Sequence, residues 1–407
     1  MPKPTYQQVS KSPAGGFREL PLISRTVLML SLVSLFTDMA SEMLYPVMPL
    51  YLKEIGFSIL GIGILEGFAE AVAGLSKGYF GTWSDNIGKR MPFVRLGYSL
   101  SALSKPMMAL FTNAWWVFMA RLVDRTGKGL RTAPRDAVLA EEATHATLAR
   151  VFGFHRALDT LGAVFGPAIA LVFLFFYPAQ YRPLFLWAFI PGIAAIALTF
   201  FIKEHAAKPN ATKKYPSFKA FYQYWLNASE DYKKLTAALL VFALFNSSDV
   251  FLLLRLKESG TEDYILISLY IIYNTVFALC AYPMGALADK YGLKKVLITG
   301  LLIFAAVYAG MAVSDNFFVF TGLFILYGIY AAATEGIAKA WITKVIHKEN
   351  TATAIGTFTG FQSIASLLAS SFAGFLWYRF GSAVAFLSSA GVTLLVALYL
   401  HFKTNKS

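Results

Sequence analysis

Long apolar segments alternate with short polar ones along nearly the whole chain. A helix needs about 20 residues to cross the hydrocarbon core of a bilayer, and the apolar segments have about that length. The pattern therefore predicts membrane-spanning helices, six in each half of the chain. Their expected positions are 26–52, 59–81, 92–112, 115–137, 150–176 and 183–202, followed by 235–256, 264–286, 294–313, 317–342, 352–377 and 382–402.

A polar motif between the second and third segments returns in the second half of the chain. The stretch GTWSDNIGKR at 81–90 corresponds to GALADKYGLKK at 285–295, with an offset of 204 residues. The same offset relates LYLKEIG at 50–56 to LRLKESG at 254–260, which agree at five of seven positions. Such a repeat indicates two similar halves. In a membrane chain it is typical of transporters.

Composition supports a membrane protein. The chain is 57% hydrophobic and 14% charged, whereas roughly a quarter of an ordinary soluble domain is charged. The net charge of +13 lies in short clusters between apolar segments, which indicates membrane orientation rather than nucleic-acid binding. A single cysteine, Cys280, excludes a disulfide within the chain, and no metal-binding spacing such as H-E-x-x-H is present. We expect no cofactor and no metal.

The distribution of lysine and arginine predicts the orientation. These residues are concentrated in one set of connections, which includes both chain ends and the long central connection. By the positive-inside rule we expect a multi-pass protein of the cell membrane with both termini in the cytoplasm. The expected units are a tail at 1–22, a six-helix bundle at 23–202, a linker at 203–234, a second bundle at 235–402 and a tail at 403–407.

The repeated motif resembles the loop signature G-x-L-a-D-r-x-G-r-k of the major facilitator superfamily, with Trp83 and Asn86 in place of its usual Leu and Arg. The resemblance covers essentially the whole chain and implies the two-bundle fold of that family. Glycines permit tight turns, and an aspartate can cap a helix N-terminus, so such contacts would latch one conformation. An ordinary positively charged loop is the alternative. The matching positions are Gly81, Asp85, Gly88, Lys89 and Arg90, and then Gly285, Leu287, Asp289, Gly292, Lys294 and Lys295.

The fifth segment resembles the antiporter signature g-x8-G-x3-G-P-x2-G-G of the same family, although the last two glycines are absent. The matching residues are Gly153, Gly162, Gly166 and Pro167. The resemblance implies antiport, commonly proton-driven export. Small residues four apart also let two helices approach closely, so a plain packing groove is the alternative. In the first segment, Pro46 and Pro49 resemble the P-x-x-P stretch of drug exporters and are predicted to bend the helix.

Charged residues inside the predicted spans are costly and are therefore candidate functional groups. Four acids occur as pairs spaced four residues apart, so each pair lies on one helix face, and the fourth span carries several arginines. A rise of about 1.5 Å per residue places acids and arginines in two matching layers, one near the membrane midplane. The candidates for proton or ion coupling are Asp38, Glu42, Glu66, Glu70, Arg121 and Arg125.

Two interpretations of these charges are open. Desolvation favours the protonated form of a carboxyl group and a nearby guanidinium favours the ionised form, so a cavity that opens and closes could load and release a proton. Asp38 is the first candidate, with Arg125 as its modulating partner. The alternative is a fixed buried network that sets helix register. The basic run from Arg125 to Arg135 contains Gly-Lys-Gly but lacks the strand and spacing of a phosphate loop. It either binds an anionic group or lines the cytoplasmic mouth.

The second half carries fewer charges within its spans. Glu335 and Lys339 have the i, i+4 spacing of a helix ion pair. Polar and aromatic residues lie at depths where a cavity is expected, and hydrogen bonding between helices is their alternative role. The candidate substrate contacts are Asn246, Asp249, Tyr270, Tyr273, Asn274 and Gln362.

The sequence thus predicts an all-α membrane protein with twelve transmembrane helices in two six-helix bundles. We expect a secondary transporter that works by alternating access and exports a small organic molecule in exchange for protons. Proton- or cation-coupled uptake is the alternative. A polytopic enzyme is disfavoured by the lack of a nucleophile–base arrangement, and a receptor by the repeat with charged cores. The expected partners are a small-molecule substrate, protons and the lipid bilayer, and we expect no nucleic acid. We also expect the protein to function as a monomer.

Overall fold

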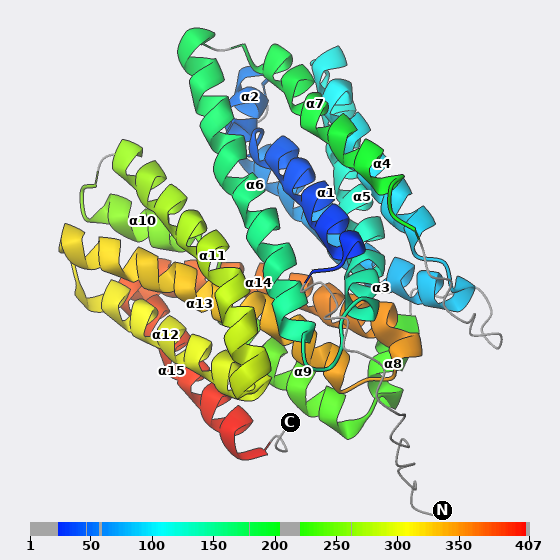
Figure 1. Cartoon of the computed structure of the whole chain (residues 1–407). Helices are drawn as coiled ribbons and strands as arrows, with labels where there is room; N and C mark the ends of the chain where they lie inside the picture. Colours follow the sequence, from blue (N-terminus) through cyan, green and yellow to red (C-terminus); the bar gives the residue numbers. More distant parts are fainter. Residues whose placement is uncertain are drawn as a thin grey trace, which may run out of the picture.

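The structure is a computed structural model that describes residues 23–45, 47–56, 59–178, 180–203, 220–261 and 263–403. All regular structure in these ranges is helical. Two bundles make up the molecule, drawn from blue to green and from yellow-green to red in Figure 1. The predicted tail at 1–22 and most of the predicted linker lie outside the described residues, so the predicted unit boundaries stay predictions.

Each bundle contains six membrane-crossing segments, as the sequence predicts. The first bundle consists of α1 (Arg25–Glu42), α2 (Met48–Glu54), α3 (Ile59–Ile87), α4 (Met91–Leu110), α5 (Ala114–Glu141), α6 (Leu148–Phe176) and α7 (Tyr181–Thr199). The second consists of α9 (Glu230–Ala243), α10 (Val250–Glu258), α11 (Asp263–Tyr291), α12 (Leu293–Val313), α13 (Phe317–Lys344), α14 (Thr351–Phe380) and α15 (Ser382–Lys403). A short helix, α8 (Ala220–Asn227), belongs to the connection between them, and a 3-10 turn, η1 (Lys348–Asn350), precedes α14.

Among the described residues, six helices are long and apolar enough to cross a membrane, judged by length and composition alone. They are α6, α7, α11, α12, α13 and α15. Of the other crossings, α5 carries several charges, the first and seventh are interrupted, and α14 is rich in Ser, Thr and Gly. This difference fits the expectation that charged and broken segments face the interior of the molecule, where polar groups find partners.

The first and seventh crossings are each divided into two helices. The first helix ends at Glu42 and resumes at Met48, in agreement with the predicted bend. The seventh was predicted as one helix over 235–256, and this was wrong because α9 ends at Ala243 and α10 begins at Val250. The interruption contains Asn246, Ser247, Ser248 and Asp249, whose short polar side chains compete with helical hydrogen bonds.

The internal repeat is visible in the packing of these short helices. Tyr51 in α2 donates to the carbonyl of Met108 at 3.4 Å, near the end of α4. Arg255 in α10, which lies 204 residues further along, donates to the carbonyl of Met311 at 3.0 Å, near the end of α12. The same position of the repeat therefore connects α2 to α4 through a tyrosine and α10 to α12 through an arginine.

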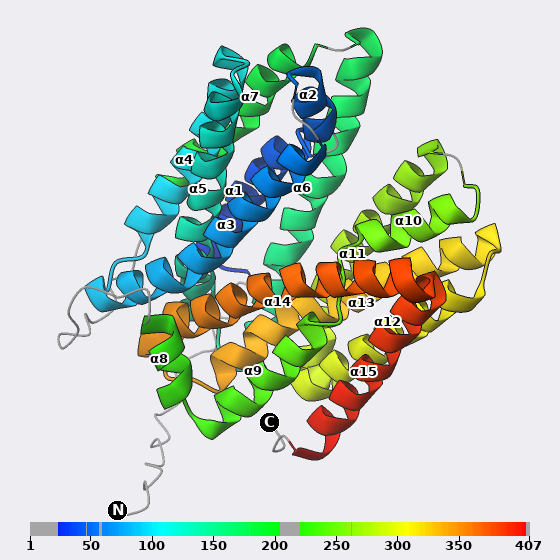
Figure 2. The ribbon, with the colours of Figure 1, turned by 180° about the vertical axis from the view of Figure 1, so that it is seen from behind.

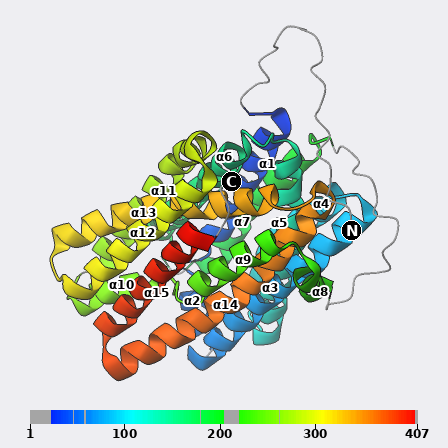
Figure 3. The same ribbon diagram turned by 90° about the horizontal axis from the view of Figure 1, so that it is seen from below.

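The two bundles meet at one end of the molecule and diverge toward the other. Figures 1 and 2 show them together near α8 and the ends of α3 and α14, and apart toward α2 and α10. Along this seam α6 packs on α11, and α3 packs on α14. Seen from below in Figure 3, α8 and α9 lie beside α14 at the closed end. The molecule is thus closed at the end that holds the repeated motifs.

Candidate functional site

A charged cavity of about 390 Å³ lies between the two bundles. Its wall in the first bundle comes from α1, α3, α5 and α6, and its wall in the second comes from α11, α13, α14 and the break before α10. The charged residues that line it are Asp38, Glu42, Lys77, Asp124, Arg125, Lys128, Arg131, Arg135, Arg156, Asp159, Asp249, Glu335 and Lys339. Charges of both signs are therefore gathered at the seam.

One face of α5 supplies most of the cations. Arg125, Lys128, Arg131 and Arg135 follow one another at helical spacing, so their side chains share the face toward the cavity. Arg131 hydrogen-bonds to Ser101, and its guanidinium lies 4.6 Å from the centre of the Tyr98 ring. The basic run of the sequence thus lines a cavity between the bundles.

Ion pairs connect the two bundles at the wall of the charged cavity. Lys339 in α13 lies 2.6 Å from Asp136 in α5, and Arg156 in α6 pairs with Glu335 in α13. The i, i+4 residues Glu335 and Lys339 therefore each pair with a residue of the opposite bundle. Arg156 also bonds to Asp159 at 2.6 Å, within its own helix.

Sequence reasoning missed Arg156 and Asp159. Both lie inside α6, which is long and apolar enough to span a membrane. The reasoning that selected Asp38, that a charge inside a span is costly, would therefore have selected them too. Lys105 was also missed. It is fully buried in α4 and holds Asp124 at 2.8 Å.

Asp38 and Glu42 line the cavity from α1, as predicted, and Arg125 faces them from α5. Neither carboxyl has a hydrogen bond or ion pair with any residue that the structure describes. Glu66 and Glu70 belong to α3, but their side chains lie outside the described part of the structure. The two-layer pairing of acids and arginines predicted from depth is thus untested for that pair.

Arg121 does not line the charged cavity. Its side chain is buried inside the first bundle, where it lies 3.7 Å from Asp124. Asp124, which lines the cavity, in turn bonds to Lys105, so Arg121 and Lys105 support a carboxylate of the cavity wall from behind. This arrangement corresponds to the fixed network that was the alternative interpretation of the buried charges.

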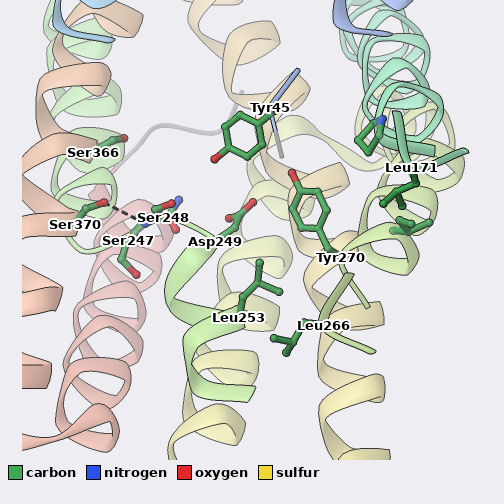
Figure 4. Close-up of a pocket in the computed structure, with 13 residues that line it drawn as sticks. Tyr45, Leu171, Ser247, Ser248, Asp249, Leu253, Leu266, Tyr270, Ser366 and Ser370 are labelled. Carbon is green, nitrogen blue, oxygen red and sulfur yellow. Dashed lines mark hydrogen bonds between the residues drawn. The ribbon is translucent and has the colours of Figure 1, made fainter. Parts of the chain in front are cut away.

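A second cavity of about 630 Å³ adjoins the first, and the two share Asp249 and Tyr270. Its other side chains are mainly apolar or carry hydroxyl groups, and they come from both bundles. Figure 4 shows Tyr45 and Tyr270 close to the Asp249 carboxylate, with Leu253 and Leu266 nearby. Asp249 accepts a hydrogen bond from the Tyr327 hydroxyl at 2.7 Å.

Every predicted substrate contact lines one of the cavities. Asn246 lines the larger, apolar one, and Asp249 and Tyr270 line both. Tyr273, Asn274 and Gln362 line the charged one. The structure therefore brings these six residues together, from α11, α14 and the break before α10.

The two repeated motifs form equivalent contacts at the closed end. Asp85 accepts from the backbone N–H of Thr353 at 2.7 Å and from its hydroxyl at 2.8 Å, at the start of α14. Asp289 accepts from the backbone N–H groups of Ala149 and Arg150 at 3.0 and 2.9 Å, at the start of α6. Each aspartate thus caps a helix of the opposite bundle and complements its dipole. Ala149 and Thr353 are themselves 204 residues apart.

The glycines of the motifs have two different roles. Gly88 and Gly292 have φ angles of 67° and 103°, so they form the turns that the sequence predicts. Gly81 and Gly285 lie inside α3 and α11 instead. A Cβ atom at either would come within 2.5 Å or less of a carbonyl oxygen of the opposite bundle. They permit close approach of helices, and their assignment to a turn was wrong.

The basic residues of the motifs also differ. Arg90 is buried and bonds to Asp85 at 3.0 Å and to Glu141. Lys294 donates to the carbonyl of His401 at 2.9 Å. Lys89 and Lys295 are exposed. In the first copy a cation of the motif itself thus holds the aspartate, and in the second copy Arg150 of α6 lies 3.9 Å from Asp289.

The glycines of the fifth crossing bring α6 against two partners. A Cβ at Gly153 would lie 2.4 Å from the carbonyl oxygen of Ala281 in α11. At Gly162 it would lie 2.4 Å from that of Leu35, and at Gly166 2.7 Å from that of Met39, both in α1. Pro167 lines the apolar cavity within a continuous helix. The signature residues thus let α6 pack tightly on both bundles.

No group of three or more His, Cys, Asp or Glu residues in the described ranges is arranged to hold a metal ion. His155 is buried in α6, and neither of its ring nitrogens has a hydrogen-bond partner within the described part of the chain. The described residues form two adjoining cavities between the bundles, and ionisable groups line one of them.

The chain is similar to transporters over nearly its whole length. The sequence profile of the Major Facilitator Superfamily matches residues 30–260 and 235–407. An uncharacterised MFS-type transporter of Methanocaldococcus jannaschii is 32% identical over 388 residues, which cover 92% of this chain and 95% of the relative. A multidrug resistance efflux pump PmrA homologue of Lactococcus lactis is 22% identical over 361 residues, 84% of this chain and 87% of the relative.

The fold agrees with these matches. The crystal structure of the human organic anion transporter MFSD10 superposes with a TM-score of 0.79 at 14% identity, over 92% of this chain and 99% of that chain. The resemblance inferred from the loop signature is therefore confirmed, as is the fold class. The protein is a multi-pass membrane transporter and not an enzyme, and it belongs to the major facilitator superfamily.

Proposed function

We propose that this protein is a proton-coupled antiporter that exports a small organic molecule. The observation that carries the proposal is the position of Asp38 and Glu42, two carboxyl groups without a partner among the described residues, on the wall of a cavity between the bundles. A carboxyl group in such a place changes its proton affinity when the surrounding cavity changes its solvent access and its neighbours. Asp38 and Glu42 are thus proposed to carry the coupled proton, with Glu66, Glu70 and Arg125 as further members of the group.

The closed end is proposed to face the cytoplasm. The connections from α3 to α4 and from α11 to α12 lie at that end. They and the adjoining helix ends carry Lys89, Arg90, Lys290, Lys294 and Lys295, and the positive-inside rule assigns such connections to the cytoplasmic side. The structure then represents the outward-facing state in the cell membrane, with both termini in the cytoplasm. In this state protons from outside reach the cavity.

The cycle follows from the contacts at the seam. The Asp85 and Asp289 contacts, together with the ion pairs of Lys339 and Arg156, hold the closed end. When these break, the bundles separate on the cytoplasmic side, protons leave Asp38 and Glu42, and substrate enters. Substrate and proton use the same cavity in turn, so the inward proton gradient drives export.

Export rather than uptake is supported by the efflux pump named above and by the antiporter-type glycines of α6. Proton-coupled uptake is the alternative. It predicts that substrate and protons move in the same direction, and a flux experiment distinguishes the two.

The test uses purified protein in proteoliposomes that contain a pH-sensitive dye, with an imposed proton gradient and a panel of drugs, amino acids and organic ions. We expect protons to move opposite to a substrate of the panel. Asp38→Asn should abolish this proton movement while the protein remains folded, because an amide cannot release a proton. The control Glu230→Gln removes an exposed carboxylate at the start of α9 and should leave transport unchanged. Proton movement of normal rate in Asp38→Asn would refute the assignment.

A further inference from the structure

We propose that the exported molecule is an amphipathic zwitterion, whose cationic group binds Asp38 and Glu42, whose anionic group binds Lys128 and whose apolar part occupies the adjoining cavity. This inference rests on the proposed function of the same site. It concerns the chemical class of the substrate, which proton coupling alone leaves open.

The charges on the cavity wall fall into two groups. Most have protein partners: Lys77 with Ser363, Arg131 with Ser101, Arg135 with Asp136, Arg156 with Asp159 and Glu335, Lys339 with Asp136, Asp124 with Lys105 and Asp249 with Tyr327. Arg125 also belongs to this group, because it too has an interaction partner. Three of the described ones, Asp38, Glu42 and Lys128, have neither a hydrogen bond nor an ion pair in the part of the chain that the structure describes.

These three residues include both signs of charge and come from two helices of the first bundle. Asp38 and Glu42 are one helical turn apart on α1, whereas Lys128 projects from the cavity face of α5. Lys128 attracts the two carboxyls through space, but none of the three side chains makes a hydrogen bond within the described residues, and ionised groups that leave water without hydrogen bonds are costly. A ligand that offers a cation to the two carboxyls and an anion to the amine satisfies all three at once. A ligand with one charge satisfies only part of the set.

The apolar cavity indicates the rest of the ligand. It is lined by Leu171, Leu253, Leu266 and Ile271, and the Tyr270 ring stands where the two cavities join. Asn246 donates to the Tyr330 hydroxyl through its nitrogen, while its buried Oδ1 atom has no hydrogen-bond partner among the residues that the structure describes. The volumes of about 630 and 390 Å³ fall within the range usual for small-molecule sites. A molecule with an apolar body fits this cavity.

The zwitterion also gives the right sign of coupling. A cationic group at Asp38 and Glu42 competes with protons for the same oxygens, so substrate binding expels protons, as antiport requires. An anion alone would attract protons to these carboxyls and would favour movement in the same direction. The cationic end therefore accounts for exchange, and Lys128 selects against molecules that carry a cation only.

The test measures binding, independently of transport, by isothermal titration of the purified protein in detergent. The probes are dipeptides with aliphatic and aromatic side chains, such as leucyl-phenylalanine, together with the methyl ester of each, which is a cation, and the N-acetyl derivative, which is an anion. We expect at least one dipeptide to bind about tenfold or more tightly than both of its derivatives, the ratio that one charge-assisted hydrogen bond supplies. Lys128→Met should abolish the preference of the dipeptide over its ester. Lys203→Met, which replaces an exposed lysine after α7, is the control.

The outcomes separate this inference from the proposed function. Equal binding of ester and dipeptide, unchanged by Lys128→Met, would overturn the zwitterion, and so would the absence of binding by every dipeptide of the panel. If an ester nevertheless drove proton exchange in proteoliposomes, the antiporter would stand and only its substrate class would be wrong. If the dipeptide bound as expected but moved no protons, the coupling would be wrong and the site would stand.

Discussion

At the scale of single residues, Asp85 shows how one carboxylate connects two bundles. Its Oδ1 atom accepts from Arg90 in its own bundle, and its Oδ2 atom accepts from the backbone and the hydroxyl of Thr353 in the other. The side chain is almost fully buried, so these bonds are not exchanged with water. Because Thr353 begins α14, separation of the bundles leaves both the carboxylate and the helix end without their partners.

Asp85→Asn should weaken the closed end. The amide keeps the shape of the carboxylate but loses its charge and turns one acceptor into a donor. A hydrogen bond to a charged group contributes about 1.5–3 kcal/mol, so the equilibrium should shift by roughly 10- to 150-fold toward the state that is open at this end. In a Cys280→Ala background, a cysteine at Ser366, which lines the apolar cavity, should then react more slowly with a maleimide reagent added from the outside. Asp231→Asn at the exposed start of α9 is the control, and unchanged reactivity in Asp85→Asn would contradict the latch.

At the scale of helices, α6 belongs to the first bundle and packs closely on a helix of each bundle. Gly153 places it against α11, while Gly162 and Gly166 place it against α1. The absence of side chains at these points lets the backbones approach closely. The same helix provides Arg156 and Asp159 to the cavity. The helix that packs closely on both bundles is thus also the one that carries Arg156 and Asp159.

Gly162→Ala should destabilise this packing. The added Cβ would lie 2.4 Å from the carbonyl oxygen of Leu35, so α1 and α6 have to move apart. We expect a loss of about 1–3 kcal/mol in the free energy of unfolding, as for other overpacked interiors. Gly322→Ala is the matched control, because this glycine lies in α13 with no atom near the new Cβ. There alanine should stabilise the helix by about 0.5–1 kcal/mol. Thermal unfolding in detergent measures both, and equal effects would show that the α1–α6 contact is not tight.

The helices themselves could be predicted because twenty apolar residues in sequence have few other stable arrangements in a membrane protein. Their ends could not. The polar stretch from Thr82 to Ile87 continues α3, because the surface of α14 covers it. The break at Asn246 was missed because polar residues at that depth indicate a cavity equally well. These outcomes depend on packing against distant segments, which one segment's pattern does not contain.

The candidate site could be predicted only in part, because its contacts also depend on segments that are distant in the sequence. Costly charges inside spans identified Asp38, Glu42 and Arg125, which do line the cavity. The partners of the latch aspartates could not be identified, since Thr353 follows Asp85 by 268 residues. Pairings such as Lys339 with Asp136 require knowing how the two bundles face each other. The repeat predicts the Asp289 contact with Ala149 only after the equivalent contact of Asp85 with Thr353 is known.

At the scale of the whole molecule, the two capping contacts form a symmetric pair. Asp85 with Thr353 and Asp289 with Ala149 are related by the same 204-residue offset in both members. Each bundle therefore offers one aspartate and one helix N-terminus to the other. If the bundles move as rigid bodies, both contacts break in a single step, and their contributions to the closed end add.

The variants Asp85→Asn, Asp289→Asn and their combination test this additivity. The two contacts share no residue, so the free energies of the single substitutions should sum in the double variant to within about 0.5 kcal/mol. Spin labels at Ile87 and Tyr291, two exposed positions that are themselves 204 residues apart at the ends of α3 and α11, report the opening as a distance distribution. The separated population should rise in each single variant and, expressed as an equilibrium constant, by the product of the two effects in the double variant. A double variant no more open than the stronger single one would mean that the two contacts open separately, which two rigid bundles do not allow.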